Sequence, residues 1–419
     1  MQQKKKVLVP ILNRAHYGRL RSVLKSIQSH ESLELQIVVG ISNAYGSFWE
    51  MIRYSKPYSW RIALAWYVRA KLIFLKSIFW PNALGHDFLV RNITKDGFTV
   101  NATVPLFLDG GSSETMANVV GLGIPKIVRI FTKLKPDVVF INADRFEMMA
   151  ITIAAAYLNI PIAHNEGGDV TGTIDESIRH AITKFAHYHF TSTFKSRDRV
   201  IRMGENPEYV FAVGSPAIDV IQNISRTPNQ DIIPGHDFEK PYLVVLLHSV
   251  ATENHEQNKI LVQSVVDAVD EIRMPTIFLG SNMDAGSNVI GEITRNWQAT
   301  KDTSYVVFKK HLPPDDFYQI LSSAACAVGN SSSFIREAAF FGTPVVLIGS
   351  RQSRRERGKN VVDVIIPEKR QIVETIQGQI QRGRYEPDYI FGEGRAGEKI
   401  ATLLANLKVP PIQKNFYES

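Results

Sequence analysis

The chain has 419 residues, 44% of them hydrophobic and 21% charged, so it can bury a large core and exceeds the usual size of one domain. This composition excludes a disordered chain, a collagen-like repeat and a small disulfide-rich scaffold. Lysines and arginines number 48 against 41 aspartates and glutamates, and the formal charge of +7 predicts attraction to anions without saying which anion.

Short β-branched apolar segments alternate with amphipathic helical stretches along the chain, as in parallel sheets that crossover helices cover on both faces. The first expected strands are residues 6–12, 35–40, 137–141, 161–163, 187–191 and 209–213. A second set comprises residues 242–247, 276–280, 305–308, 325–329, 345–348 and 362–366. The pattern predicts two doubly wound α/β domains.

The polar stretch 225–240 separates the two sets of strands and contains Pro228, Pro234 and Gly235. Turn-forming residues between periodic segments indicate where the chain crosses from one domain to the next. We therefore expect a first Rossmann-like domain over residues 1–230, a second over 231–395, and a C-terminal helix and tail over 396–419.

Cysteine content and hydropathy bear on the cellular compartment. Cys326 is the only cysteine, which excludes an intrachain disulfide and a cysteine-based zinc site and favours a reducing compartment. We expect no secretion signal, because the apolar run after the basic start stops at Leu12. These features predict a cytoplasmic protein.

Residues 58–80 are the best membrane candidate in the chain. A membrane span needs ~20 predominantly apolar residues, and four cations interrupt this stretch: Arg61, Arg69, Lys71 and Lys76. Its interleaved aromatic and basic residues predict an amphipathic helix, which would either lie on a membrane surface or pack within the protein or in a subunit interface. We favour packing.

Polar residues follow most of the expected strands. In open α/β sheets the ligand binds beyond the carboxyl ends of the strands, so these positions are informative. They are Arg14, Asp144, Arg145, His164, Glu166, Gly214, Ser215, His248 and the run Gly329, Asn330, Ser331 and Ser332. A strand that leaves a core often ends in polar residues, but the coincidence across both sheets predicts one shared cleft.

The run 329–333 reads as a tight turn between a strand and a helix over 334–341 that ends at Gly342. Free N–H groups at a helix start and the hydroxyls of Ser331 and Ser332 predict a phosphate site. Glu337, six residues beyond Ser331, is placed to reach a ribose. Five basic residues follow the next strand, and we expect one or two of them to bind a diphosphate. They are Arg351, Arg354, Arg355, Arg357 and Lys359.

Carboxylates gather over residues 164–176, around Gly167 and Gly168. Clustered acids can hold one carboxyl protonated and another ionised, as paired acid and base chemistry requires. We interpret Asp175 as a helix N-cap and Asp169 as a residue that could serve only a turn, whereas Glu166 has no evident structural duty.

Several cofactor and metal motifs are absent from the sequence. His164-Asn165-Glu166 has the H-x-E form of the zinc deaminases, but those enzymes also need a cysteine pair, and this chain has one cysteine. The chain has no P-loop, no G-x-G-x-x-G at its first helix and no G-x-S-x-G elbow. We expect neither a metal nor a cofactor.

Three groups of motifs resemble the hydrolysing UDP-N-acetylglucosamine 2-epimerases. They are residues 164–182 (HNEGGDVTGTIDESIRHAI), residues 143–147 (ADRFE), and the order Gly329 to Ser332, Arg336-Glu337, 341–344 (FGTP) and 350–352 (SRQ). The resemblance covers roughly residues 5–45 and 100–400. It implies the GT-B architecture, in which two Rossmann-like domains face each other across a cleft and a C-terminal helix often returns to the first.

The resemblance also implies a reaction and roles for individual residues. UDP would be eliminated from the sugar to leave an unsaturated 2-acetamido glycal, and water would then add to give free N-acetylmannosamine. Matching motif positions imply Asp144, Glu166 and Glu176 as acid and base candidates, and His248 and Arg14 beside the sugar or the departing phosphate. Ser331 and Ser332 would bind the phosphates, Glu337 the ribose, and Arg351 and Gly214 the nucleotide; the supporting residues are Arg145, His164, Asp169 and Arg179.

Some positions depart from the family pattern. Ala143 and His16 replace the expected glycine and aspartate, a histidine expected near Gly40 is missing, and an insertion occupies about 47–101. These departures leave two alternatives, a different N-acetylated sugar nucleotide as the substrate or weak activity. A GT-B glycosyltransferase that uses a UDP-sugar donor is the alternative, whereas the acids of the cleft argue against nucleic-acid binding. We expect a homo-oligomer with a UDP-sugar substrate.

Overall fold

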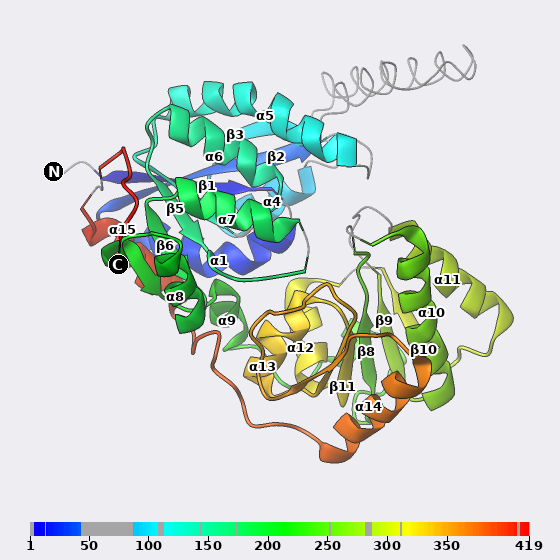
Figure 1. Ribbon diagram of the computed structural model, residues 1–419. Helices are drawn as coiled ribbons and strands as arrows, with labels where there is room; N and C mark the ends of the chain where they lie inside the picture. Colours follow the sequence, from blue (N-terminus) through cyan, green and yellow to red (C-terminus); the bar gives the residue numbers. More distant parts are fainter. Residues whose placement is uncertain are drawn as a thin grey trace, which may run out of the picture.

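The computed structural model describes residues 4–12, 14–42, 87–107, 113–142, 145–172, 174–250, 253–280, 287–310, 312–408 and 411–418. They form two lobes, each built on one parallel sheet (Figure 1). The seven-stranded sheet has the order β3-β2-β1-β4-β5-β6-β7, and the six-stranded sheet has the order β10-β9-β8-β11-β12-β13. Both contain the 3-2-1-4-5-6 arrangement of a Rossmann fold, so the predicted pair of doubly wound domains is confirmed.

The first lobe alternates strands and helices along the chain. Its strands are β1 (Lys5–Ile11), β2 (Leu33–Ser42), β3 (Val100–Phe107), β4 (Val138–Asn142), β5 (Ile162–Asn165), β6 (Tyr188–Thr191) and β7 (Val210–Ala212). Its helices are α1 (Arg14–Ser29), α4 (Asp87–Lys95), α5 (Ser113–Leu134), α6 (Glu147–Tyr157), α7 (Asp175–Phe185), α8 (Phe194–Arg202) and α9 (Pro216–Ile221). A short 3-10 turn, Pro207–Tyr209, precedes β7.

The second lobe repeats this plan. Its strands are β8 (Leu243–Leu246), β9 (Thr276–Leu279), β10 (Val306–Lys309), β11 (Cys326–Gly329), β12 (Val345–Ile348) and β13 (Val361–Val364). Its helices are α10 (His255–Ile272), α11 (Ser287–Thr300), α12 (Pro314–Ser323), α13 (Arg336–Phe341) and α14 (Lys369–Arg382), with 3-10 turns at Gln230–Ile232 and Ser332–Phe334. The last helix, α15 (Ala396–Asn406), leaves this lobe.

Each sheet is covered on both faces by apolar clusters, as parallel sheets require. In the first lobe, Val9 and Phe140 face α1, whereas Leu8 and Ile141 face α5 and α6.

All twelve expected strands are present, with ends that differ by a few residues. The sequence pattern missed β3, which contains Pro105 and lies at the edge of its sheet, where a residue without an N–H is tolerated.

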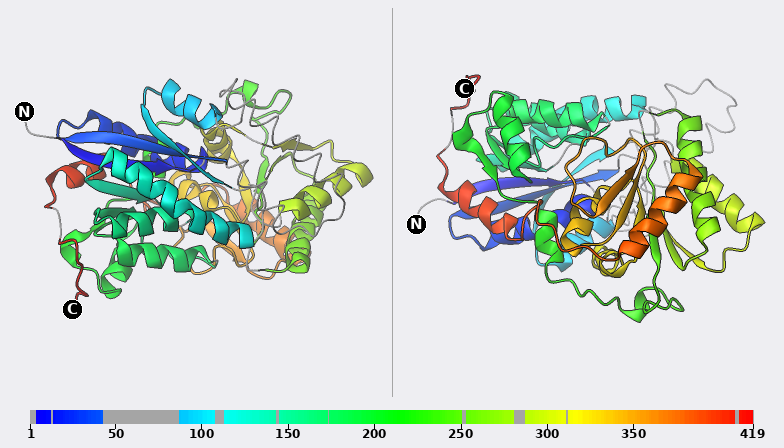
Figure 2. Two further views of the ribbon diagram at one scale, coloured as in Figure 1. Left: turned by 90° about the horizontal axis from the view of Figure 1, so that it is seen from above. Right: turned by 60° about the horizontal axis from the view of Figure 1, so that its bottom comes forward.

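The crossing between the lobes begins in α9. Ile218 and Ile221 of this helix, and Ile233 beyond it, join an apolar cluster of the second lobe. Figure 2 shows α15 lying beside the first lobe, where Ile400 and Leu404 pack with Leu24 of α1. The domain boundaries at residues 230 and 395 stay predictions.

The C-terminal tail lies against the first lobe on the side of β6 and α8. The Tyr188 hydroxyl donates to the Lys408 carbonyl at 3.0 Å, and His187 Nε2 hydrogen-bonds to the Ile412 carbonyl at 3.1 Å. The Phe416 ring covers Gly204, where a Cβ would lie 2.3 Å from a ring carbon. Gly204 also has a φ of +84°, so both its backbone and its surroundings favour glycine.

Residues 58–80 lie outside the described residues, so the expected amphipathic helix is not tested. Within the described part of the chain, no helix is both long enough and apolar enough to span a membrane.

Candidate active site

Glu166 is the first residue after β5 and lies at the junction of the two lobes. Its side chain is buried, and its φ of +63° is in the left-handed region, which is rare for a residue with a side chain. Its backbone N–H donates to the Phe190 carbonyl at 2.8 Å and holds this conformation. Strained conformations of this kind persist where the surroundings fix them, and they cluster at functional sites.

The two oxygens of Glu166 have different surroundings. Oε1 accepts hydrogen bonds from Arg336 Nη1 at 2.7 Å and from the Ser215 hydroxyl at 3.3 Å. Oε2 is buried, and no hydrogen-bond partner is found for it among the described residues. A buried acceptor without a partner is costly, so this oxygen is suited to receive a donor or a proton from a ligand.

Positive charge keeps Glu166 ionised. Burial by itself would raise the pKa of this carboxyl, but the charge of Arg336 opposes burial, with smaller contributions from Arg19 and Arg355, and the net pKa is lowered. A buried carboxylate that stays charged can act as a base once a substrate excludes water.

Asp169 ties the same loop to the second lobe. Its Oδ2 accepts from Arg336 Nη2 and from Arg355 Nη2, both at 3.3 Å, and its Oδ1 accepts from the Ser196 hydroxyl at 2.8 Å. The buried Arg179 donates to its carbonyl at 2.7 Å. Asp169 therefore does more than shape a turn, because its carboxylate joins the two lobes.

Two predicted residues near this loop, His164 and Glu176, make contacts that support its structure. His164 lies within β5, and its Nδ1 is 3.1 Å from the Thr183 hydroxyl. Glu176 Oε2 accepts the Thr171 N–H at 2.6 Å. The N-cap prediction for Asp175 is wrong. Ile174 occupies the N-cap position, Asp175 is the first helical residue, and the helix begins without a side-chain cap.

Two other predicted residues have partners outside this loop. Arg145 pairs with Glu147, with Nη2 3.0 Å from Oε1. Gly214 has a φ of +93° and lies where a Cβ would be 3.2 Å from Gly392 Cα, so it permits close packing of two loops.

The loop after β11 joins the ends of two strands. Asn330 Oδ1 accepts the His248 N–H at 2.7 Å, and Asn330 Nδ2 donates to the His248 carbonyl at 2.8 Å. Gly329 is essential to this approach, since a Cβ there would lie 2.1 Å from the Leu246 carbonyl oxygen. Arg351 Nη1 donates to the Asn330 carbonyl at 3.2 Å.

The expected helix over 334–341 begins differently. Ser331 caps a 3-10 turn by accepting the Ser333 N–H at 3.4 Å, and the α-helix starts only at Arg336. Its end at Gly342 is confirmed by a left-handed φ of +69°. Ser332 Oγ accepts from Arg19 Nη2 at 3.1 Å, which brings a cation of the first lobe to the serine turn.

Glu337 is fully buried in α13, and neither carboxylate oxygen has a hydrogen-bond partner among the described residues. Burial, with the charge of Glu337, raises the pKa of the neighbouring Tyr318. A buried carboxylate without donors is unfavourable, so a ligand that offers two hydroxyls would relieve a real cost.

His248 and His16 are buried beside arginines of the site, and both surroundings favour the neutral imidazole. Burial, and then the charges of Arg351 and Arg19, lower the pKa of His248 to about 3. Burial, with Arg145 and Arg19, lowers the pKa of His16 to about 3, although Glu166 acts in the opposite direction. His248 Nδ1 is buried, and no partner is found for it in the described part of the chain.

Not every predicted residue can be placed. Asp144 lies outside the described residues, and Arg14 is described only as the first residue of α1. The sequence did not single out Arg19 as a site residue or give Arg336 a role. Arg19 lies between one and two turns into α1, the helix that follows β1, and that position was the available signal.

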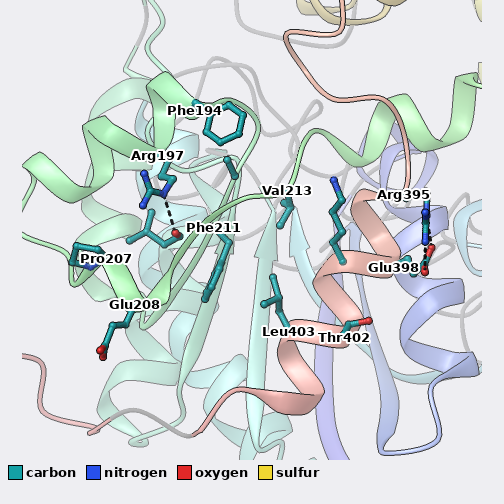
Figure 3. Close-up of a pocket in the computed structure, with 13 residues that line it drawn as sticks. Phe194, Arg197, Pro207, Glu208, Phe211, Val213, Arg395, Glu398, Thr402 and Leu403 are labelled. Carbon is teal, nitrogen blue, oxygen red and sulfur yellow. Dashed lines mark hydrogen bonds and ion pairs between the residues drawn. The ribbon is translucent and has the colours of Figure 1, made fainter.

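The described residues include no group of three His, Cys, Asp or Glu side chains that could hold a metal ion. A cavity of about 690 Å³ lies between α8 and α15, beside the edge strand β7 (Figure 3). Phe194, Arg197 and Leu403 are among its lining residues, and none of the predicted site residues lines this cavity in the described structure.

Two Rossmann-like domains that face each other define the GT-B class, so the fold implied by the resemblance is confirmed. Residues 86–405 match the family model described as UDP-N-acetylglucosamine 2-epimerase. The chain belongs to this family.

Two related sequences align with nearly the whole chain. A UDP-N,N'-diacetylbacillosamine 2-epimerase (hydrolyzing) of Legionella pneumophila is 31% identical over 96% of this chain and 96% of its own. A UDP-N-acetylglucosamine 2-epimerase of Neisseria meningitidis is 28% identical over 96% of this chain and 95% of its own. The resemblance to the hydrolysing branch is confirmed.

Solved structures show the same fold. One is the structure of the Methanocaldococcus jannaschii UDP-GlcNAc 2-epimerase in complex with UDP-GlcNAc and UDP. Its sequence is 17% identical, and its TM-score is 0.72 over 96% of this chain and 99% of that one. That of the Neisseria meningitidis UDP-GlcNAc 2-epimerase bound to UDP-GlcNAc is 15% identical, with a TM-score of 0.70 over 96% of this chain and 100% of that one.

Proposed function

We propose that this protein is a hydrolysing 2-epimerase that converts UDP-N-acetylglucosamine, or a related UDP-2-acetamido sugar, to the free 2-epimer and UDP. The observation that carries the proposal is Glu166. It is a buried carboxylate that lies where the two domains meet, with one oxygen held by Arg336 and the other without a hydrogen-bond partner among the described residues.

The proposed reaction has two steps. Removal of the C2 proton by a carboxylate supplies electrons for a C1–C2 double bond, and the bond between C1 and the UDP oxygen breaks. The hydroxyl of water then adds to C1, and a proton returns to C2 on the opposite face. Asp144, Glu166 and Glu176 are the proposed acid and base groups.

The second domain supplies the proposed nucleotide site. Ser331 and Ser332 would donate to the phosphates, and Arg351 and Arg19 would stabilise the charge that develops on the departing diphosphate. Arg19 already reaches Ser332, at 3.1 Å, so it lies at the turn in question. Glu337 would accept the ribose hydroxyls, because its two oxygens are buried and have no donors among the described residues.

The sugar is the finer part of the proposal. The relatives include a UDP-N,N'-diacetylbacillosamine 2-epimerase and a UDP-N-acetylglucosamine 2-epimerase at comparable identity, 31% and 28%. Both substrates carry an acetamido group on C2, the carbon at which the proposed reaction inverts the configuration. We propose this class of sugar, released in the cytoplasm by a homo-oligomer.

Incubation in heavy water without an acceptor tests the proposal. UDP-N-acetylglucosamine and UDP-N,N'-diacetylbacillosamine are supplied separately, and the products are followed by NMR. The proposal predicts release of UDP and of a free sugar with deuterium at C2 and inverted configuration for at least one substrate. A sugar that stays bound to UDP until an acceptor is added would support the glycosyltransferase alternative instead.

A further inference from the structure

Arg336 joins the two lobes at the proposed reaction site. It is the first residue of α13, and its side chain is 3% exposed. Its Nη1 lies 2.7 Å from Glu166 Oε1, and its Nη2 lies 3.3 Å from Asp169 Oδ2. Both carboxylates belong to the loop after β5, so one guanidinium is forked across two carboxylates of the opposite lobe.

We propose that Arg336 is a positioning residue for the epimerase reaction, which fixes Glu166 so that its second oxygen is presented to the sugar when the lobes are in contact. The proposal rests on the proposed function above. The planar fork of an arginine suits this task, because its two N–H groups hold two acceptors in a fixed relation. Since Oε1 is occupied, Oε2 is the oxygen left for the substrate.

Among the charged groups around Glu166, Arg336 lowers the pKa of its carboxyl most. The surrounding groups are Arg336 and Glu337 from α13, Arg19 and His16 from α1, Arg355 from the loop after β12, and Asp169 from its own loop. Arg336 makes the direct contact and the largest opposing contribution to burial. Without it, burial would prevail, and the carboxyl would take up a proton at a higher pH.

The charge also bears on how the lobes meet. An isolated carboxylate resists burial strongly, whereas one that is paired and hydrogen-bonded does not. In the Arg336→Gln variant, contact between the lobes would bury Glu166 without its charge partner. We therefore expect a defect in the chemical step, since Arg336 makes no described contact with the proposed phosphate residues.

The experiment compares Arg336→Gln with a matched control, Arg21→Gln. The Arg21–Asp315 pair also joins the lobes, at 2.7 Å, but its side chains are 34% and 49% exposed. We expect Arg336→Gln to lower kcat by about 100-fold or more and to move the acid limb of kcat/KM to higher pH, with the UDP Kd within about threefold. Arg336→Lys should restore part of the rate, and Arg21→Gln should stay within about twofold of the wild type.

Several results would overturn the proposal. They are an unchanged pH profile, a loss of UDP affinity as large as the loss of rate, or an increase in kcat in Arg336→Gln. Melting temperatures of Glu166→Gln, Arg336→Gln and the double variant give a test without turnover. Because the two side chains are in contact, the decreases in melting temperature of the two single variants should not add up in the double variant. Additive decreases, in an enzyme whose wild type is active, would refute the role of Arg336 and leave the proposed function standing. Absence of turnover in the wild type with any UDP-2-acetamido sugar would refute the proposed function as well.

Discussion

Replacing Glu205 should destabilise the protein strongly although this residue is remote from the candidate active site. Glu205 is 2% exposed and lies between α8 and β7. Its Oε1 is 2.6 Å from Lys184 Nζ, and its Oε2 is 2.5 Å from Lys414 Nζ in the C-terminal tail and 3.0 Å from His189 Nε2. Glu205→Gln would leave two lysines beside a neutral amide.

The magnitude follows from the pKa of Glu205. Burial would raise it, but His189, Lys184 and Lys414 together lower it from the ordinary 4.5 to about 2. Since a tenfold change in acidity corresponds to ~1.4 kcal/mol, this difference contributes about 3 kcal/mol to folding. Because the folded pKa is the lower one, the contribution is complete above pH 4.5 and disappears as the pH falls towards 2.

Urea unfolding at a series of pH values measures this contribution. At pH 7, Glu205→Gln should lose about 3 kcal/mol, and the loss should shrink between pH 4.5 and 2. Glu208→Gln is a matched control, because Glu208 is exposed and should change stability by less than ~0.5 kcal/mol. If Glu205→Gln is as stable as this control, or if its loss does not depend on acid pH, the reasoning is refuted.

Three further predictions concern the site and the insertion. Glu166→Gln should abolish turnover and leave UDP affinity nearly unchanged, because Glu166 belongs to the sugar end; loss of UDP binding in calorimetry would contradict that placement. Ser331→Ala combined with Ser332→Ala should weaken UDP binding by ~1–3 kcal/mol, the scale of hydrogen bonds to a charged group, and unchanged affinity would remove the phosphate assignment. Residues 58–80 should not make the protein sediment with anionic vesicles; salt-reversible sedimentation that disappears when their four cations become glutamine would overturn the packing prediction and favour the transferase.

The fold could be predicted because its strands are local apolar runs. Residues 345–348 lie between Pro344 and Gly349, and β12 has these limits. Strand β3 was missed because Asn101, Thr103 and Pro105 interrupt the continuous apolar run that marks the other strands. In the structure these three residues are exposed, and the edge position of β3 tolerates the missing N–H of Pro105.

The candidate site could be predicted in part for the same reason. Glu166 and Ser331 follow strands directly, so the rule on strand ends finds them. Arg336 meets Glu166 across 170 positions, and Arg19 meets Ser332 across 313, so no local pattern marks either contact. Such partners depend on how the two lobes face each other, which only the folded chain reveals.

Oxygen-18 water tests the central claim, elimination of UDP from C1 followed by addition of water. The enzyme is incubated with UDP-N-acetylglucosamine or UDP-N,N'-diacetylbacillosamine in labelled water, and both products are analysed by mass spectrometry. We predict one oxygen-18 atom on the released sugar and none in UDP, because the bond between C1 and the UDP oxygen breaks while the phosphorus–oxygen bonds stay intact. Oxygen-18 in UDP would show attack on phosphorus and would contradict the account.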